Sequence, residues 1–222
     1  MLAGEAVVAI WNGITPDMRD AFHDWHINEH IPERVGIPGF RRGRRYIAAD
    51  AATHPAFFTL YEADTMQVLQ GSDYTNRLNA PTSGTRHVTA QFRDTFRALS
   101  RVVFSHGPGA GGALLTIRFD CNAADLPALG LAVGGVARSP RITGAHLCAG
   151  DTEASAVRSA ESRDRTDLQA PPSAFALVEA LDSEALAGTL PDAALSAAGA
   201  RGPFARGVYR LEYTRTKTAF AP

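Results

Sequence analysis

Side chains able to accept or donate protons are concentrated in residues 23–34, which hold three of the chain's seven histidines and two glutamates. Histidine titrates near neutral pH, so it is well suited to remove a proton from a substrate. We expect His26 to act as general base and Glu29 to orient or share its proton. His30, or an arginine of the following strand, would stabilise negative charge that develops on the substrate. The segment therefore predicts acid–base catalysis on a small molecule.

These groups are expected on one helix over residues 16–34, opened by an N-cap threonine and a proline. At about 100° per residue, Glu29 falls within an apolar stripe and His26 lies at its border. A carboxylate there is costly to bury unless it is paired or hydrogen-bonded, and burial raises its pKa. Two interpretations stay open. Glu29 pairs with an arginine of residues 41–45 and only fastens helix to sheet, or Glu29 and His26 form the polar end of a pocket.

Substrate contacts are expected from Trp25 on the helix and from the arginine-rich strand that follows it. Alternate side chains of a strand share a face, so Arg42, Arg44 and Tyr46 point the same way. The guanidinium groups suit an anionic substrate or a glutamate partner. We therefore assign Trp25 and these three strand residues to substrate binding.

His26 and His30 also fit the inverted zinc-protease pattern H-x-x-E-H. Two histidines four residues apart face the same side of a helix, as a metal site requires. However, no acidic third ligand stands out downstream, and Pro32 ends the helix directly afterwards. We assign no metal ligand and no cofactor, and keep haem as the one cofactor to test for.

The elements that position these residues occur twice along the chain. Residues 56–63 are echoed by residues 174–181 at an offset of 118, and residues 43–50 by residues 144–151 at an offset of 101. The difference of 17 requires an insertion in the second copy, which residues 152–173 supply. Their polar composition and closing Pro-Pro pair are typical of a mobile loop.

Each copy shows the order strand, helix, strand, strand, helix, strand, which is the ferredoxin-like βαββαβ arrangement. Strands are expected at residues 6–11, 40–48, 57–62, 98–105, 113–119, 143–149, 175–181 and 208–214, and helices at residues 16–34, 65–78, 124–137 and 183–198. The fold class is α+β, with two tandem repeats that bury their sheets against each other in one barrel-like body. We expect repeats over residues 1–106 and 113–222, joined by a glycine-rich linker at 107–112. Because the helix at 124–137 has no histidine or glutamate, the chemistry belongs to the first repeat.

The composition is that of a soluble globular protein, with 222 residues, 45% of them hydrophobic and 20% charged. A net charge of -1 gives no overall attraction to nucleic acid or to an anionic membrane, so neither is an expected partner. No stretch approaches the roughly 20 apolar residues that span a bilayer. Cys121 and Cys148 are too few for a disulfide scaffold, which favours a reducing compartment, and the cytoplasm is the expected location. Formation of a homodimer is left open.

The segment Trp25-His26 followed by His30-Ile31-Pro32 resembles the W-H-x-x-x-H-x-P signature of EthD-like proteins in the dimeric α/β-barrel superfamily. Residues 38–46 are similar to that group's second strand. The two repeats resemble fused members that build an intrachain dimeric α/β-barrel. The resemblance implies a small-molecule pocket between helices and sheet. The superfamily includes cofactor-free monooxygenases of aromatic polyketides and quinols, muconolactone-type isomerases, dehydratases and haem-binding branches.

Three functions remain after these observations. The first is a cofactor-independent oxygenase, isomerase or dehydratase that acts on a compact aromatic or enolisable small molecule. The second is a haem- or small-ligand-binding protein without turnover. The third is a structural module for assembly, in which the histidine-bearing helix only packs. The fold supports many chemistries, so the residues of the site must decide among the three.

Overall fold

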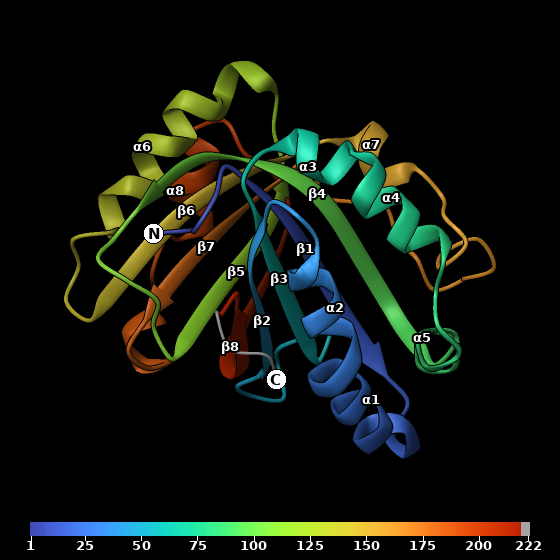
Figure 1. Ribbon diagram of the computed structural model, residues 1–222. Coiled ribbons are helices and arrows are strands. Elements are labelled where there is room, and N and C mark those ends of the chain that lie inside the picture. Colours follow the sequence, from blue (N-terminus) through green and yellow to red (C-terminus); the bar gives the residue numbers. More distant parts are fainter. Residues whose placement is uncertain (219–222) are drawn as a thin grey trace.

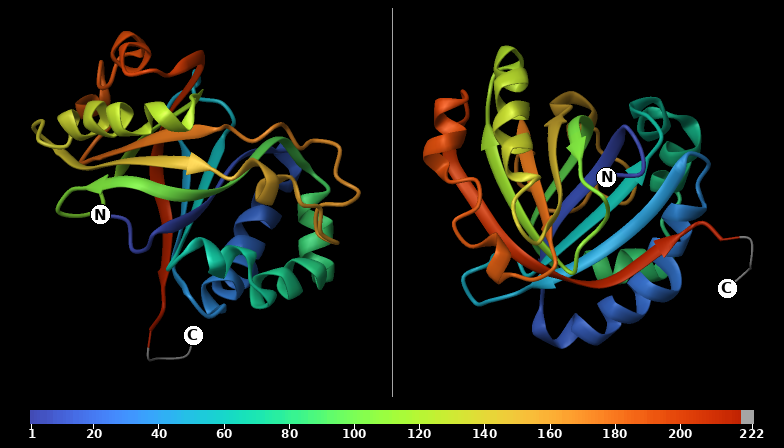
Figure 2. Two further views of the ribbon diagram at one scale, coloured as in Figure 1. Left: turned by 90° about the horizontal axis from the view of Figure 1, so that it is seen from above. Right: turned by 90° about the vertical axis from the view of Figure 1, so that its left-hand side faces the viewer.

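The computed structural model describes residues 1–218 and shows one closed barrel of eight antiparallel strands with helices outside it (Figures 1 and 2). The strands are β1 (Ala6–Ile14), β2 (Phe40–Ala48), β3 (Phe57–Ala63), β4 (Phe92–His106), β5 (Ala113–Asp120), β6 (Ile142–Gly150), β7 (Ala174–Ala180) and β8 (Arg201–Thr216). The helices are α1 (Arg19–Trp25), α2 (Ile31–Gly36), α3 (Met66–Gln70), α4 (Ser72–Asn79), α5 (Ser83–Thr89), α6 (Leu126–Val136), α7 (Thr152–Ala156) and α8 (Asp192–Ala197). The predicted α+β fold class, two βαββαβ units in one barrel, is confirmed.

Two halves of the barrel have the same strand arrangement. The first half contains β1 to β4 in the order β4-β1-β3-β2, and the second half contains β5 to β8 in the order β8-β5-β7-β6. They join edge to edge, because β2 pairs with β8 and β4 pairs with β6. Closure leaves no strand edge of the barrel unpaired.

The strand register identifies equivalent positions in the two halves. Ile10 of β1 pairs with Thr59, and Ile117 of β5 pairs with Ala176. In the same ladders, Val8 pairs with Tyr61 and Leu115 pairs with Val178. Thr59 and Tyr61 of the first half therefore occupy the places of Ala176 and Val178 in the second.

Two of the predicted helices are shorter or interrupted, and most strands are longer than the sequence pattern predicted. The expected helix at 65–78 is interrupted at Gly71 and forms α3 and α4. The expected helix at 183–198 is reduced to a 3₁₀ turn at Glu184–Leu186 and to α8. Strand β4 begins six residues before the predicted start at 98. No helix of residues 1–218 is long and apolar enough to cross a membrane.

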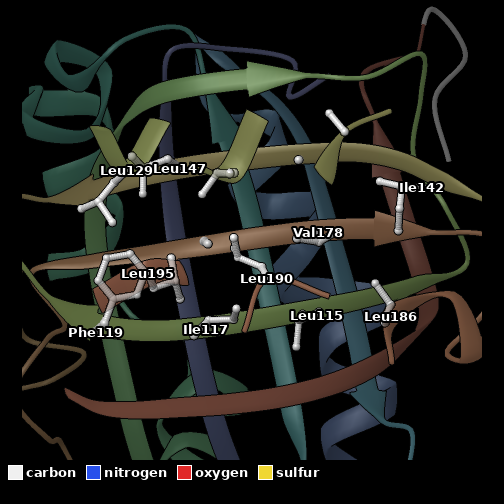
Figure 3. Close-up of a cluster of buried hydrophobic side chains, with 14 of the residues drawn as sticks. Leu115, Ile117, Phe119, Leu129, Ile142, Leu147, Val178, Leu186, Leu190 and Leu195 are labelled. Carbon is white, nitrogen blue, oxygen red and sulfur yellow. The ribbon is translucent and has the colours of Figure 1, made fainter. Parts of the chain in front are cut away.

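Both faces of the sheet are buried, since one faces the barrel interior and the other the helices. In the interior, rings and aliphatic side chains from both halves pack together, including Trp11, Tyr46, Phe58, Phe175 and Tyr209. On the helix side of the second half, α6 and α8 cover a wholly hydrophobic cluster (Figure 3). The first half packs two smaller clusters under its helices, one around Ile31 and Phe40 and one around Phe22 and Trp25.

A chain of charged groups crosses the barrel interior. Arg44 donates to Glu62 at 3.0 Å and to Glu179 at 2.9 Å, and thus links the two halves. His146 lies 3.2 Å from the other oxygen of Glu179, and its Nδ1 is 2.8 Å from the Ser105 hydroxyl. Burial raises the pKa of Glu179, but the hydrogen bond from His146 and the charge of Arg44 outweigh it and lower that pKa to about 2. The barrel thus buries these carboxylates in paired form.

Candidate functional site

The helix that carries the predicted site changes its winding at the histidines. Helix α1 continues into a π-helical turn at His26–His30 and then into α2. The Ile31 amide donates to the His26 carbonyl, five residues back, as in a π-helix. Pro32 follows directly, and proline has no amide hydrogen to continue the ordinary ladder. Single π turns of this kind are frequent at functional sites.

This turn stacks three rings, those of Trp25, His26 and His30. The Trp25 ring is nearly parallel to that of His26, with centroids 5.1 Å apart, and lies 4.2 Å from that of His30. Both histidines are buried, with 4% and 5% of their surface exposed. The Trp25 indole donates to the Thr85 hydroxyl of α5 at 3.2 Å, which fixes the stack against a neighbouring helix.

A cavity of about 40 Å³ lies between the histidine-bearing turn and the sheet. Its lining joins the three stacked rings to side chains of β1, β3, β4 and α4: Ile10, Asn12, Thr59, Tyr61, Tyr74, Leu78, Phe92, Thr95 and Arg97. Among residues 1–218, four buried polar atoms of this lining have no hydrogen-bond partner: Nδ1 of His26, Nδ1 of His30, the Thr59 hydroxyl and the Tyr61 hydroxyl. Unsatisfied buried groups are rare in proteins, and a polar ligand or an ordered water in the cavity would supply these four atoms with partners.

Both histidines are held in the uncharged form. Burial lowers the pKa of His26 well below its ordinary value, and the nearby positive charge of Arg45 adds to this effect. Burial also lowers the pKa of His30, with Arg34 as the main charged contributor. Burial raises the pKa of the Tyr61 phenol well above its ordinary value. At neutral pH the cavity therefore offers two imidazoles that can accept a proton and one phenol that can donate a hydrogen bond.

The insertion of the second half closes this cavity of the first half. Glu161 forms an ion pair with Arg34, whose guanidinium is buried and also contacts Glu33 at 3.0 Å. Arg165 donates to the Thr95 hydroxyl at 2.8 Å and lies over the ring of Phe92. The insertion predicted to be a mobile loop begins with helix α7. Its remainder, residues 157–173, packs on β4 and covers the cavity, and we call this segment the cover.

Two backbone hydrogen bonds attach this cover to β4. The Thr95 amide donates to Asp167 at 3.0 Å, and Gln169 donates back to the Thr95 carbonyl at 2.8 Å. Leu168 between them forms a parallel bridge with Thr95. The cover is therefore fastened by main-chain pairing as well as by ion pairs.

The structure places Glu29 outside the cavity, which corrects both interpretations of this residue. Its carboxylate accepts hydrogen bonds from the hydroxyls of Thr82 and Thr85 at the start of α5. It is partly exposed, it is not part of the cavity lining, and among the described residues no arginine pairs with it. The π turn explains the difference, because its wider winding shifts every residue from the position that 100° per residue predicts. The described residues also contain no group of three or more metal-ligating side chains.

The arginines assigned to substrate binding lie on the opposite side of the sheet from the histidines. Arg44 and Tyr46 face the barrel interior, and Arg42 pairs with Glu62 through two hydrogen bonds of 2.8 Å. Arg45, from the alternate face, is the strand arginine that lies near His26, and it is paired with Glu212 at 3.1 Å. The prediction that Arg42, Arg44 and Tyr46 share one face was correct. The prediction that this face meets the substrate beside the histidines was wrong, because it is the face toward the barrel interior. A closed barrel buries both faces, so burial alone could not choose between them.

Several residues of the cavity lining were not anticipated. Thr59 alternates with buried apolar residues along β3, and this pattern could have indicated a polar surface under the helix. Arg34 and Arg97 were assigned no role from the sequence, and both line the cavity. Glu161 and Arg165 lie in the insertion, more than 120 residues from the histidines, and no local pattern connects them.

Haem does not fit beside these histidines. Haem is a wide planar group with iron at its centre. A histidine that binds this iron therefore needs a wide open space beside it. The space beside His26 and His30 is about 40 Å³, whereas an engineered cavity that binds benzene, a much smaller molecule than haem, measures about 150 Å³. The larger hollows near this site, next to α7 and the insertion, have no histidine in their lining.

No protein-family model matches the chain, and no curated protein matches it. Solved structures do share its fold. An anthrone oxidase-like protein superposes with a TM-score of 0.61 at 13% identity, over 95% of this chain and 92% of its own. A candidate monooxygenase from Fusobacterium nucleatum subsp. nucleatum gives 0.53 at 9%, over 97% and 96%. A chlorite dismutase from Candidatus Nitrospira defluvii gives 0.52 at 11%, over 93% and 92%. Identities this low show fold alone, and the fold they show is the fused dimeric α/β-barrel.

Proposed function

We propose that the protein is a small-molecule enzyme of EthD-like type, in which His26 removes a proton from an aromatic or enolisable substrate. The observation that carries the proposal is the pair of buried, uncharged histidines on a π turn, beside a cavity whose polar atoms lack partners. An uncharged imidazole is the form that accepts a proton. A lowered pKa keeps that form present on the acid side of neutrality as well.

The remaining polar groups suit the charge that proton removal creates. The hydroxyls of Thr59 and Tyr61 are free to donate to an enolate or phenolate oxygen. These groups are in place before substrate arrives, so their reorganisation costs little.

The preferred reaction is cofactor-independent oxygenation. A cavity of about 40 Å³ holds one or two molecules the size of water, and dioxygen is of that size. A methylene activated by neighbouring rings or a carbonyl would lose a proton to His26, and the carbanion would add to dioxygen. Loss of water from the resulting hydroperoxide leaves a ketone, so that CH2 and O2 become C=O and H2O. The likeness to an anthrone oxidase-like fold supports this choice, and isomerisation or dehydration would begin with the same proton removal.

The test uses anthrone, which has one activated methylene. Without oxygen, NMR in deuterium oxide should show protein-dependent exchange of the methylene protons. With oxygen, an electrode should show uptake above the rate in buffer. We expect His26→Ala to lower both rates about 100-fold or more.

The matched control is His54→Ala, since His54 lies on the exposed surface with its ring 71% accessible. Its rates should equal those of the original protein. Full exchange and oxygen uptake by a correctly folded His26→Ala protein would remove His26 from the mechanism. Absence of methylene exchange in the original protein would reject proton removal from this class of substrate.

A further inference from the structure

A groove of about 350 Å³ lies next to the cavity and is lined by residues of α4 and α7. Figure 1 shows where these two helices lie. Its walls include apolar side chains of α3, α4 and β4 and of the residue that follows α7, namely Leu69, Leu78, Leu99 and Val157. The groove and the cavity share Tyr74, Leu78 and Arg97 as lining residues. These three side chains therefore form the boundary between an open apolar groove and the histidine cavity.

The cavity and the groove differ in size, so they can hold different parts of a substrate. The cavity of about 40 Å³ is too small for an aromatic ring, since benzene occupies an engineered cavity of about 150 Å³. The groove of about 350 Å³ is within the range of about 300–1,000 Å³ that is usual for ligand pockets. A substrate that presents its reactive atom to His26 must therefore keep most of its body in the groove, next to Arg97.

Arg97 has an unusually small set of partners for a half-buried arginine. Its guanidinium donates to the Tyr74 hydroxyl at 3.1 Å and lies 6.0 Å from the centre of that ring. No carboxylate within residues 1–218 forms an ion pair with it. A guanidinium has five N–H donors, so most of its donors at this boundary are available to a ligand.

The equivalent arginine of the second half shows what full pairing looks like. Ile10 pairs with Arg97 across the ladder of β1 and β4, and Ile117 pairs with Arg206 across that of β5 and β8. Arg206 forms an ion pair of 2.6 Å with Asp192 and donates to two main-chain carbonyls. In the second half a carboxylate and two main-chain carbonyls of the protein pair with this arginine, whereas in the first half its hydrogen-bond partner is the Tyr74 hydroxyl.

We propose that Arg97 binds an oxyanion of the substrate, which is an amphipathic aromatic acid, with its ring body in the groove and its carboxylate on Arg97. This deepens the proposed function and rests on it only for the reaction that follows binding. The carboxylate would form charge-assisted hydrogen bonds in the paired geometry that guanidinium groups favour. The apolar walls of the groove would bind the ring.

The experiment compares two probes of one shape, 2-naphthoate and the uncharged 2-naphthamide, by isothermal titration calorimetry. The original protein should bind the naphthoate at least tenfold more tightly. Arg97→Gln should reduce the ratio of the two Kd values to within about twofold, and Arg97→Lys should restore part of it. Arg206→Gln removes the same charge at the equivalent position and should leave the ratio unchanged.

Three outcomes would overturn the assignment of Arg97. These are a ratio near one in the original protein, no binding of naphthoate at millimolar concentration, and a full preference that persists in Arg97→Gln. Neither probe has an activated methylene, so their binding does not depend on catalysis. If naphthoate preference depends on Arg97 but His26→Ala keeps full turnover, the proposed function is refuted and the Arg97 site stands. If His26→Ala loses turnover but naphthoate preference does not depend on Arg97, the Arg97 site alone is refuted.

Discussion

The helix–sheet interfaces of the two halves have the same backbone plan and opposite content. In the second half, buried hydrophobic side chains, most of them leucine, isoleucine, valine and alanine, pack together beneath α6 and α8 (Figure 3). In the first half, the positions equivalent to Ala176 and Val178 hold Thr59 and Tyr61, and two histidines face them. The comparison teaches that a few substitutions, and a π turn, convert a packed interface into a cavity without altering the barrel.

The two interfaces also differ in what they contribute to stability. Apolar burial stabilises the second interface, while unsatisfied polar atoms weaken the first. Proteins tolerate such locally destabilising groups mainly at functional sites. Four predictions test this contrast, beginning with the largest effect.

Leu129 on α6 is fully buried in the second interface, so Leu129→Ala should lower the free energy of unfolding by about 2–5 kcal/mol. Urea denaturation measures this loss. Leu131 is on the same helix and 80% exposed, and Leu131→Ala should change stability by less than about 0.5 kcal/mol. Similar losses for both variants would mean that the second interface is not tightly packed.

Glu161 connects the cover to the first interface through Arg34, and Glu161→Gln should lower the free energy of unfolding by about 1–3 kcal/mol. The cause is the buried guanidinium, which keeps Glu33 as its remaining carboxylate partner. Hydrogen exchange by mass spectrometry should also accelerate across residues 157–171. Glu153→Gln, on the exposed face of α7, is the control and should leave that exchange unchanged. Unaltered protection in Glu161→Gln would show that the ion pair does not hold the cover.

His26 and His30 should make stability depend on pH below about 6.5, the ordinary pKa of histidine. Below this pH the unfolded chain binds protons at both residues, whereas the folded chain does not, because burial has lowered their pKa. Stability is therefore complete above pH 6.5 and falls by about 1.4 kcal/mol per pH unit for each histidine as the pH decreases. Unfolding measured from pH 7.5 to 5.5 should show a flatter profile when both residues are glutamine. An unchanged slope in that double variant, with His54→Gln as control, would contradict the assigned neutral state.

Tyr61 and Tyr209 give the smallest and most discriminating comparison, since both are buried and only one has a partner. The Tyr209 hydroxyl donates to the Pro55 carbonyl at 3.0 Å, and the Tyr61 hydroxyl has no partner in residues 1–218. Tyr209→Phe should lower stability by about 1 kcal/mol, and Tyr61→Phe should leave it unchanged or raise it by up to about 1 kcal/mol. Thermal unfolding measures both. A loss of equal size in Tyr61→Phe would show that its hydroxyl is satisfied in solution.

The fold could be predicted because its signals are local and occur twice. Buried strands such as residues 57–63 and 174–180 show the same apolar pattern, and the order of elements then restricts the topology to one arrangement. Helices were less predictable, since glycines such as Gly71 and Gly188 interrupt stretches that have helical composition. Helix ends depend on such single residues, whereas strand order does not.

Only those site residues that lie on the same helical segment could be placed together from the sequence. The four-residue spacing of His26 and His30 brought these residues together with Trp25, and their catalytic roles stay predictions. Glu29 was misplaced because a π turn leaves no clear signal in composition. Arg42 and Arg44 were misplaced because alternation defines two faces without naming the one under the helix. The residues of the cover depend on tertiary contacts that no local pattern contains.

The ion pair between Arg34 and Glu161 joins residues 127 positions apart, which determines when the site can form. A chain emerging from the ribosome can complete the first four strands and their helices well before Glu161 is synthesised. Until then the histidines lie in an interface without its cover, and the complete site cannot bind a ligand. Because the cover belongs to the second half and the histidines to the first, the covered site requires both halves of the chain, and the first half made alone would leave its histidines uncovered.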